Sequence, residues 1–196
     1  RKYLRGSLAS HTIGYIGAIN EEEYKNNEGY SMNDYIGKAG VEYVFEKYLR
    51  GENGSKQTDM SIDGTKTGEY VTKEAVQGDD VVLTIDANLQ QVTENSLKTH
   101  LEEIKSGKLG ETRNVDSAAA VVLDVKTGEV LALASYPDFE PELFIDGISK
   151  EKWNEYNDEK KSALINRCIQ SAYAPGSIFK MVTAIAGLET GAITTK

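Results

Sequence analysis

Two apolar runs joined by a short polar turn constrain the fold of this chain more than any other stretch. Residues 117–125 and 129–135 are rich in Ala, Val and Leu, and Lys126-Thr127-Gly128 separates them. Apolar, β-branched runs around a glycine-containing turn predict a β-hairpin. Because both runs are nearly continuous in apolar residues, we expect the sheet to be covered on both faces. Other elements of the chain must therefore pack around this hairpin.

Helical and strand patterns elsewhere predict a mixed α+β chain. Residues 86–104 carry apolar side chains at helical spacing, and Asp86 is the expected N-cap of that helix. Residues 81–85 are expected to form a short strand just before it. Nearer the N-terminus, the patterns predict a strand or strand pair over residues 8–19, an amphipathic helix within 36–51, and hairpins or irregular strands over 52–74.

Composition excludes some classes of partner. The net charge is −9 and the isoelectric point is about 4.9, so no basic stripe is available to neutralise nucleic-acid phosphates. Cys168 is the single cysteine, which excludes an internal disulfide, and we expect a buried structural thiol there.

No apolar run approaches the ~20 residues of a membrane span. The first residues resemble the middle of a domain, and we expect residues 1–196 to be a piece of a longer protein.

The stretch 173–188, YAPGSIFKMVTAIAGL, carries the candidate chemistry. Ser177 and Lys180 are three residues apart, so helical spacing places them on one face. Lys180 is the only charged residue between Ile178 and Leu188, and an all-apolar helix is usually buried. Burial favours the neutral amine, which could take the proton of the Ser177 hydroxyl. The pair therefore predicts an activated nucleophile for acyl transfer.

Non-catalytic interpretations of this spacing stay open at this point. Ser177 could be an N-cap, and Lys180 could extend its stem to bring the ammonium to water. The same spacing recurs at Ser149 and Lys152, within the charged segment SKEKWNEY. We interpret that second copy as a helix cap. The two histidines, His11 and His100, are not expected to bind metal, and no metal or cofactor is expected elsewhere.

The extended motif AYAPGSIFKMVTAIAGLE resembles the active-site serine motif of penicillin-binding proteins, the transpeptidases that cross-link the bacterial cell wall. The upstream segments SLASHTIGYIG, GKAGVEYVFEKYLRG and DDVVLTIDANLQ are similar to class B, monofunctional members, so the resemblance covers nearly the whole chain. It implies a non-catalytic N-terminal domain of the pedestal or dimerisation type over residues 1–77. The first part of the transpeptidase domain would follow over 78–196, with the boundary near Gln77.

The resemblance also implies a reaction and partners. Ser177 would attack the D-Ala-D-Ala carbonyl of a peptidoglycan stem peptide with Lys180 as general base, and β-lactams would acylate the same serine. The family's S-x-N and K-T-G elements follow the serine motif, so Lys66-Thr67-Gly68 and Lys126-Thr127-Gly128 are not expected to be catalytic. The implied partners are stem peptides, β-lactam antibiotics, the remaining part of the transpeptidase domain and a membrane glycosyltransferase. The implied location is the outer face of the bacterial cytoplasmic membrane, with the anchoring helix upstream.

Two other functions are compatible with the motif. A serine β-lactamase or β-lactam sensor shares S-x-x-K, although the long N-terminal region with GKAGVEYVFEKYLRG argues against it. A non-catalytic scaffold that binds a partner and is never acylated is the third possibility. Labelling with a fluorescent penicillin separates the scaffold from the other two, and the rate of deacylation separates the transpeptidase from the β-lactamase.

Overall fold

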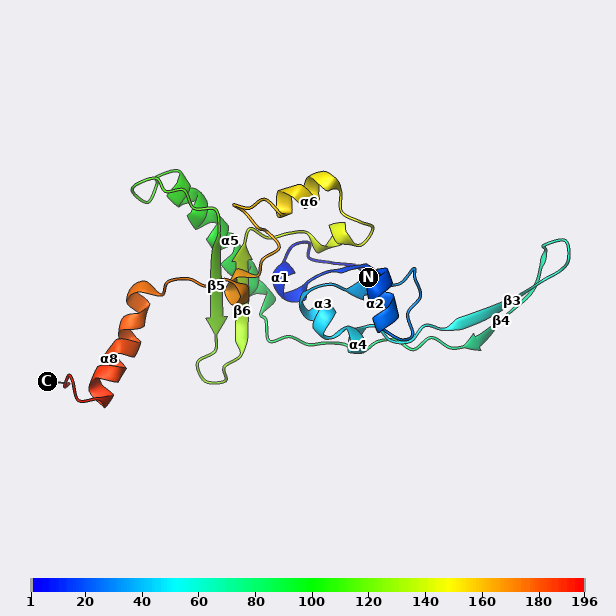
Figure 1. The fold of residues 1–196 in the computed structure, drawn as a ribbon, viewed down its shortest axis with the longest axis horizontal. Coiled ribbons are helices and arrows are strands. Elements are labelled where there is room, and N and C mark those ends of the chain that lie inside the picture. The colour runs from blue at the N-terminus through cyan, green and yellow to red at the C-terminus, as the bar shows by residue number, and fades with distance from the viewer. Residues whose placement is uncertain (1, 196) are drawn as a thin grey trace.

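The computed structural model describes residues 2–195 and is elongated. A central body carries a projecting hairpin at one end and a detached helix at the other (Figure 1). The helices are α1 Ser10–Ile13, α2 Glu21–Asn26, α3 Gly40–Val44, α4 Glu46–Leu49, α5 Ala87–Lys105, α6 Lys150–Tyr156, α7 Arg167–Gln170 and α8 Lys180–Glu189, with 3-10 turns η1 Pro141–Phe144 and η2 Gly176–Phe179; the strands are β1 Ile16–Ala18, β2 Tyr35–Gly37, β3 Ser55–Met60, β4 Lys66–Lys73, β5 Ala118–Leu123 and β6 Val130–Tyr136.

The predicted apolar hairpin is confirmed as β5 and β6, which pair antiparallel with Ala120 opposite Ala134. Asp124 shapes the turn, since its Oδ1 accepts from the backbone N–H groups of Lys126 (2.7 Å) and Thr127 (3.0 Å). Gly128 has φ +78°, a left-handed conformation that suits glycine. Lys126-Thr127-Gly128 is thus part of the turn between the two strands.

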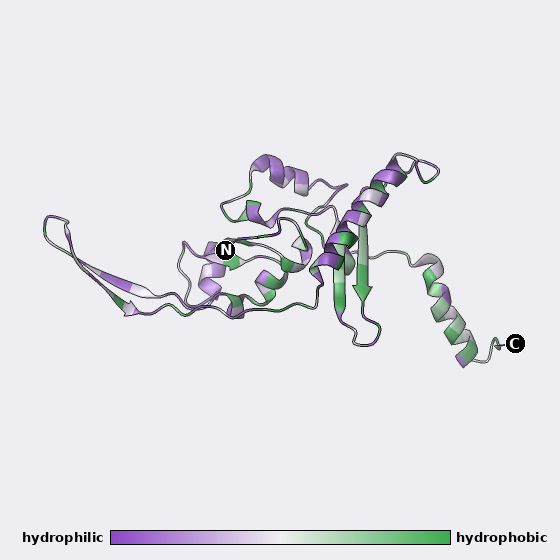
Figure 2. Ribbon diagram, turned by 180° about the vertical axis from the view of Figure 1, so that it is seen from behind, coloured by the Kyte–Doolittle hydropathy of each residue, from purple (hydrophilic) through white to green (hydrophobic). Residues whose placement is uncertain are grey.

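Helix α5 packs against the hairpin, as Figures 1 and 2 show from opposite sides. Its predicted cap is confirmed, because Asp86 accepts from the N–H groups of Asn88 and Leu89. The other expectation, cover on both faces of the sheet, is not met within the described residues. Val121 and Leu123 are 46% and 54% exposed, because no described element lies over them. The apolar face of β5 therefore lacks a partner in this part of the molecule.

The strand predicted over residues 81–85 does not form, and this prediction was wrong. The edge of β6 that does not pair with β5 is bound by other groups. The Thr84 hydroxyl donates to the Val130 carbonyl (2.7 Å), and the Asp86 N–H donates to the Leu131 carbonyl (2.9 Å). The buried Gln90 amide then exchanges two hydrogen bonds with the Leu133 backbone, at 2.7 and 2.9 Å. These contacts replace the ladder that a third strand would make.

The strand or strand pair predicted over residues 8–19 is only partly confirmed. β1 pairs with β2, but the chain before it forms the short helix α1. The reason is a reversal at each end of α1, where Ala9 (φ +54°) and Gly14 (φ +80°) leave the extended region. A Cβ on Gly14 would lie 1.8 Å from the Ala39 carbonyl oxygen, so only glycine permits this close approach.

The helix predicted within residues 36–51 is divided into α3 and α4 by Phe45, whose backbone leaves the helical region. Its apolar side is not buried as expected, since Val44 is 68% and Tyr48 54% exposed. The hairpin predicted over residues 52–74 is confirmed as β3 and β4, and it projects from the body (Figure 1). Lys66-Thr67-Gly68 begins β4 and lies on this projection.

The main core cluster joins the first and last thirds of the chain. Phe139, Phe144, Tyr156 and Ala163 are buried together, and Tyr15 packs against them. The rings of Tyr15 and Phe144 stack with centroids 4.0 Å apart, while the Tyr15 ring meets Phe139 edge-on at 5.9 Å. Such aromatic pairs each add about 0.5–1.5 kcal/mol beyond their buried area. The N-terminal region is therefore anchored on the segment that follows β6.

Candidate active site

Ser177 lies in the 3-10 turn η2, and Lys180 is the first residue of α8. The turn predicted from Pro175-Gly176 is confirmed, because Pro175 is the N-cap of η2 and Gly176 has φ +56°. Side chains three positions apart eclipse one another in a 3-10 turn, so this geometry keeps the serine and the lysine on one side. Helix α8 ends as expected at Thr190, followed by Gly191 with φ +71°.

The surroundings of the pair differ from the sequence-based expectation. No residue of α8 is buried, and Met181 and Ile185 are 70% and 61% exposed. Lys180 is exposed as well, so the poorly hydrated site expected for it is wrong for the described structure. The reason is position: α8 extends away from the body after an exposed segment (Figure 1). Figure 2 shows that this detached helix is mainly apolar.

Neither side chain of the pair has a partner in the described part of the chain. The Ser177 hydroxyl and the Lys180 amine form no hydrogen bond or ion pair with residues 2–195. The Ser177 carbonyl accepts the Lys180 backbone N–H, which is a helical contact. Within these residues, neither the hydroxyl nor the amine is engaged by another side chain, so both can contact a substrate.

The residues around the start of α7, which precede the exposed segment before Ser177, are in contrast firmly held. Asn166 caps α7 by accepting from the Cys168 N–H (3.2 Å). The Ser135 hydroxyl accepts from the Arg167 N–H and donates to the Ile165 carbonyl, both at 3.1 Å. Sequence reasoning missed Ser135, Asn166 and Arg167 as structural residues, and only the cap preference of Asn166 could have indicated one of them.

Cys168 is half-buried, and its side chain contacts both strands of the hairpin. Its Sγ lies 3.1 Å from the Ala134 carbonyl oxygen and 3.6 Å from that of Ala120. Burial raises the pKa of this thiol, which keeps it protonated near neutral pH. The expected structural role agrees with this environment, although the side chain is less buried than predicted.

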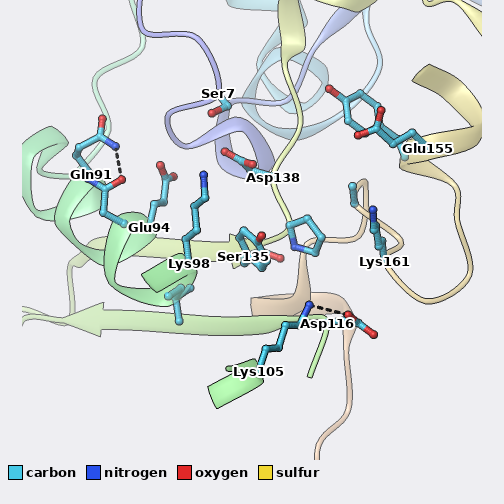
Figure 3. A pocket seen from close by; sticks show the side chains of 16 residues that line it. Ser7, Gln91, Glu94, Lys98, Lys105, Asp116, Ser135, Asp138, Glu155 and Lys161 are labelled. Atoms are coloured by element: carbon cyan, nitrogen blue, oxygen red, sulfur yellow. Dashed lines mark hydrogen bonds and ion pairs between the residues drawn. The ribbon is translucent and has the colours of Figure 1, made fainter. Parts of the chain in front are cut away.

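A polar cavity of about 410 Å³ lies between α5, the end of β6 and the segment after α6. In Figure 3, Glu94, Lys98 and Asp138 lie on one side of it, with Glu155 and Lys161 opposite. Burial raises the pKa of Glu94, whose carboxylate accepts from the Ala9 N–H (2.9 Å). Ser177 and Lys180 do not line this cavity, and sequence reasoning did not predict it.

Across residues 2–195, no group of three or more His, Cys, Asp and Glu side chains is arranged to hold a metal ion. No helix in that range combines the length and apolar character needed to cross a bilayer. His11 is partly buried, and His100 is exposed on α5.

Comparison with known families decides the identity of the two parts. Residues 1–83 match the penicillin-binding protein dimerisation domain, and residues 118–196 match the penicillin-binding protein transpeptidase domain. The chain belongs to the penicillin-binding proteins. The predicted family and the mixed fold are thereby confirmed. The domain division at Gln77 and the roles of Ser177 and Lys180 stay predictions.

Individual relatives agree with this family. The chain is 34% identical over 200 residues to the peptidoglycan D,D-transpeptidase MrdA of Escherichia coli K12, covering 99% of the chain and 29% of that protein. It is 38% identical over 196 residues to penicillin-binding protein 3 of Bacillus subtilis 168, covering 98% of the chain and 26% of the relative. The chain therefore spans less than a third of the length of these curated relatives.

Solved structures of relatives share the fold. A chain of a peptidoglycan synthase complex, described for its coordination of polymerization and crosslinking, matches with a TM-score of 0.83 and 37% identity over 100% of this chain and 34% of its own length. Penicillin-binding protein PBP2 of Helicobacter pylori, solved in complex with MreC, matches with a TM-score of 0.72 and 28% identity, over 98% of this chain and 33% of its own.

Proposed function

We propose that this chain is the part of a peptidoglycan D,D-transpeptidase that supplies the nucleophile Ser177 and the general base Lys180. The observation that supports this most is the transpeptidase match over residues 118–196, which contains both residues. Relatives along nearly the whole chain that are named peptidoglycan D,D-transpeptidase give the substrate class. The substrate is then a stem peptide that ends in D-Ala-D-Ala, and no metal or cofactor takes part.

The proposed reaction uses one acyl-enzyme. Lys180 Nζ takes the hydroxyl proton while Ser177 Oγ bonds to the carbonyl carbon of the penultimate D-Ala. The peptide C–N bond breaks, and the terminal D-Ala leaves with that proton on its amine. An amine of a neighbouring stem then attacks the Ser177 ester, forms the cross-link and releases the serine. A β-lactam would acylate the same oxygen, and because the bond that breaks is part of a ring, the departing nitrogen stays tethered to the acyl group.

The base requires surroundings that the described residues do not supply. A lysine amine in water is protonated, and burial is what favours its neutral form. The exposed apolar side chains of α8 and of β5 can be buried together by a further transpeptidase segment, which we propose as the immediate partner. Each fully buried Val, Leu, Ile or Met side chain contributes about 1.5–3 kcal/mol. The same packing would remove water from Lys180.

The proposed setting is the bacterial cell-wall machinery. The similarity to a chain of a peptidoglycan synthase complex supports a membrane glycosyltransferase as a further partner. Such work takes place on the outer face of the cytoplasmic membrane, where an upstream helix would anchor the protein. The alternatives, a β-lactamase, a β-lactam sensor or a scaffold, have no specific observation in their favour.

Labelling with a fluorescent penicillin tests this proposal in the complete protein. Ser177→Ala should abolish covalent labelling, because no other hydroxyl combines the turn, the apolar helix and the lysine. Ser149→Ala is the matched control and should label like the wild type. Labelling that survives Ser177→Ala overturns the assignment. Rapid deacylation of the wild type would favour the β-lactamase alternative over the transpeptidase.

A further inference from the structure

The projecting hairpin β3–β4 joins the body through a short pair of chain segments. Glu52 and Val76 exchange two backbone hydrogen bonds there, at 2.8 and 3.0 Å. A few residues further out, Ser55 pairs with Lys73 at the start of the ladder of the hairpin. These four residues and those between them on each side, which we call the hairpin base, therefore fix how the projection leaves the body (Figure 1).

One side of the hairpin base contains Asn53-Gly54, the only Asn-Gly pair in the sequence. The Asn53 side chain is exposed, and its amide nitrogen lies 3.5 Å from Asp34 Oδ2. This contact is longer than the about 2.7–3.2 Å of a well-formed N–H···O bond. Gly54 lies just outside β3, and its backbone N–H makes no hydrogen bond with the described residues 2–195. The side-chain amide and the following backbone nitrogen are thus both weakly held.

These two neighbouring groups can react with each other. The Gly54 nitrogen, once a base in the solvent has taken its proton, attacks Cγ of Asn53 and forms a cyclic succinimide. The side-chain nitrogen leaves as ammonia. Water then opens the ring at either of its two carbonyls, which gives aspartate or isoaspartate at position 53. The sum is the hydrolysis of one amide, so a neutral side chain becomes a carboxylate without any oxidation or reduction.

Packing in the hairpin base keeps glycine at the second position of this pair. A Cβ on Gly54 would lie 2.8 Å from both the Ala75 nitrogen and the Lys73 carbonyl oxygen on the opposite side. Any other residue would therefore push the two sides apart. A side chain after asparagine hinders the attack, as the β-branched Val115 does after Asn114, which is also exposed. Close packing thus retains an asparagine that lacks this protection.

We propose that Asn53-Gly54 is a spontaneous modification site, at which water converts Asn53 to aspartate and isoaspartate and thereby loosens the hairpin base. This inference is independent of the role of Ser177. The new carboxylate faces that of Asp34, which already accepts from the Arg50 guanidinium at 3.0 Å. Two like charges at this distance repel each other, whereas the original amide could donate.

Isoaspartate has a second effect, because its main chain runs through the former side chain and is longer by one methylene. The added length lies between Glu52 and Ser55, whereas the opposite side, from Lys73 to Val76, is unchanged. Both backbone pairings of the hairpin base then cannot be kept without distortion. Modification at this one position therefore changes how the whole projection is held.

The first test follows each asparagine by peptide mass spectrometry while the complete protein is kept at physiological temperature. Asn53 should deamidate at least about tenfold faster than Asn114, which corresponds to a barrier lower by about 1.4 kcal/mol. The rate should rise with pH, because the attacking nitrogen must lose its proton. Electron-transfer fragmentation should identify isoaspartate among the products. Equal rates at Asn53 and Asn114, or a rate at Asn53 that does not rise with pH, would overturn the proposal.

Hydrogen exchange on the aged protein tests the effect on the hairpin base. The amides of Glu52 and Val76 should exchange about threefold faster in the modified fraction, while those of α5 should stay as they were. Asn53→Asp adds the charge without lengthening the main chain and should give a smaller acceleration. Asn53→Gln, whose longer side chain cyclises poorly, should give none after the same incubation. Unchanged exchange in the modified wild type, or equal acceleration in aged Asn53→Gln, would refute the inference.

Discussion

The chain contains two Ser-x-x-Lys stretches, and the structure places them in opposite circumstances. Ser149 caps α6 by accepting the Lys152 N–H at 3.2 Å, and the Lys152 amine pairs with Glu155 at 2.9 Å. The prediction of a cap there is confirmed. Ser177 and Lys180, with the same spacing, leave the hydroxyl and the amine without partners among residues 2–195.

The same Ser-x-x-Lys spacing therefore occurs both where the two side chains are already bonded and where they have no partner among residues 2–195. At the first stretch, both side chains are used within a single turn of a solvated helix, so nothing remains for a reaction. At the second, the apolar residues of α8 replace the local partners that a surface helix would offer. Matched substitutions in the two stretches test this difference.

The largest effect is expected at the two lysines. Lys180→Arg should lower penicillin acylation by about two to four orders of magnitude, because a guanidinium does not give up its proton and general-base catalysis is worth that much. Lys152→Arg keeps the ion pair with Glu155 and should acylate at the wild-type rate. Stopped-flow labelling of the complete protein measures both. Near-normal acylation by Lys180→Arg would show that Lys180 is structural, so that the two Ser-x-x-Lys stretches would not differ in function.

A second effect concerns helix stability in residues 1–196 expressed alone. Helix α8 has 10 residues, none buried, and isolated helices shorter than about 12–15 residues are marginal in water. Its amides should therefore exchange hydrogen at nearly unprotected rates, while those of α5 should be protected at least about a hundredfold. The same protein should acylate poorly. Efficient acylation together with equal protection of α8 and α5 would contradict the need for a covering segment.

The smallest effect is the thermodynamic cost of removing each hydroxyl. Ser149→Ala should destabilise the protein by about 1 kcal/mol, which is the usual cost of losing an N-cap. Ser177→Ala should change the free energy of unfolding by less than about 0.5 kcal/mol, since its hydroxyl bonds nothing in the described residues. Urea unfolding of residues 1–196 compares the two. A larger cost for Ser177 would mean that it, too, is a structural cap.

Local signals in the sequence determined the elements whose bonds close within a few residues. The Asp86 cap, the Ser149 cap, the Lys126–Gly128 turn and the end of α8 before Gly191 were all predicted and are confirmed. Capping and turn formation depend on side chains one to four positions away, which a pattern can reveal. The serine motif was found in the same way, through its turn, its spacing and its apolar helix.

Contacts between distant residues were decided only by the tertiary structure. Residues 81–85 have the composition of a strand, but the Gln90 side chain occupies the edge of β6 that such a strand would need. The segment before β1 alternates like a strand, yet α1 forms there and brings His11 to Ala163. The apolar pattern of α8 predicts a buried helix, but no residue of α8 is buried, because no described element packs against it. Periodicity shows which side chains of a helix or strand share a face. The packing of one element on another depends on residues far apart in sequence.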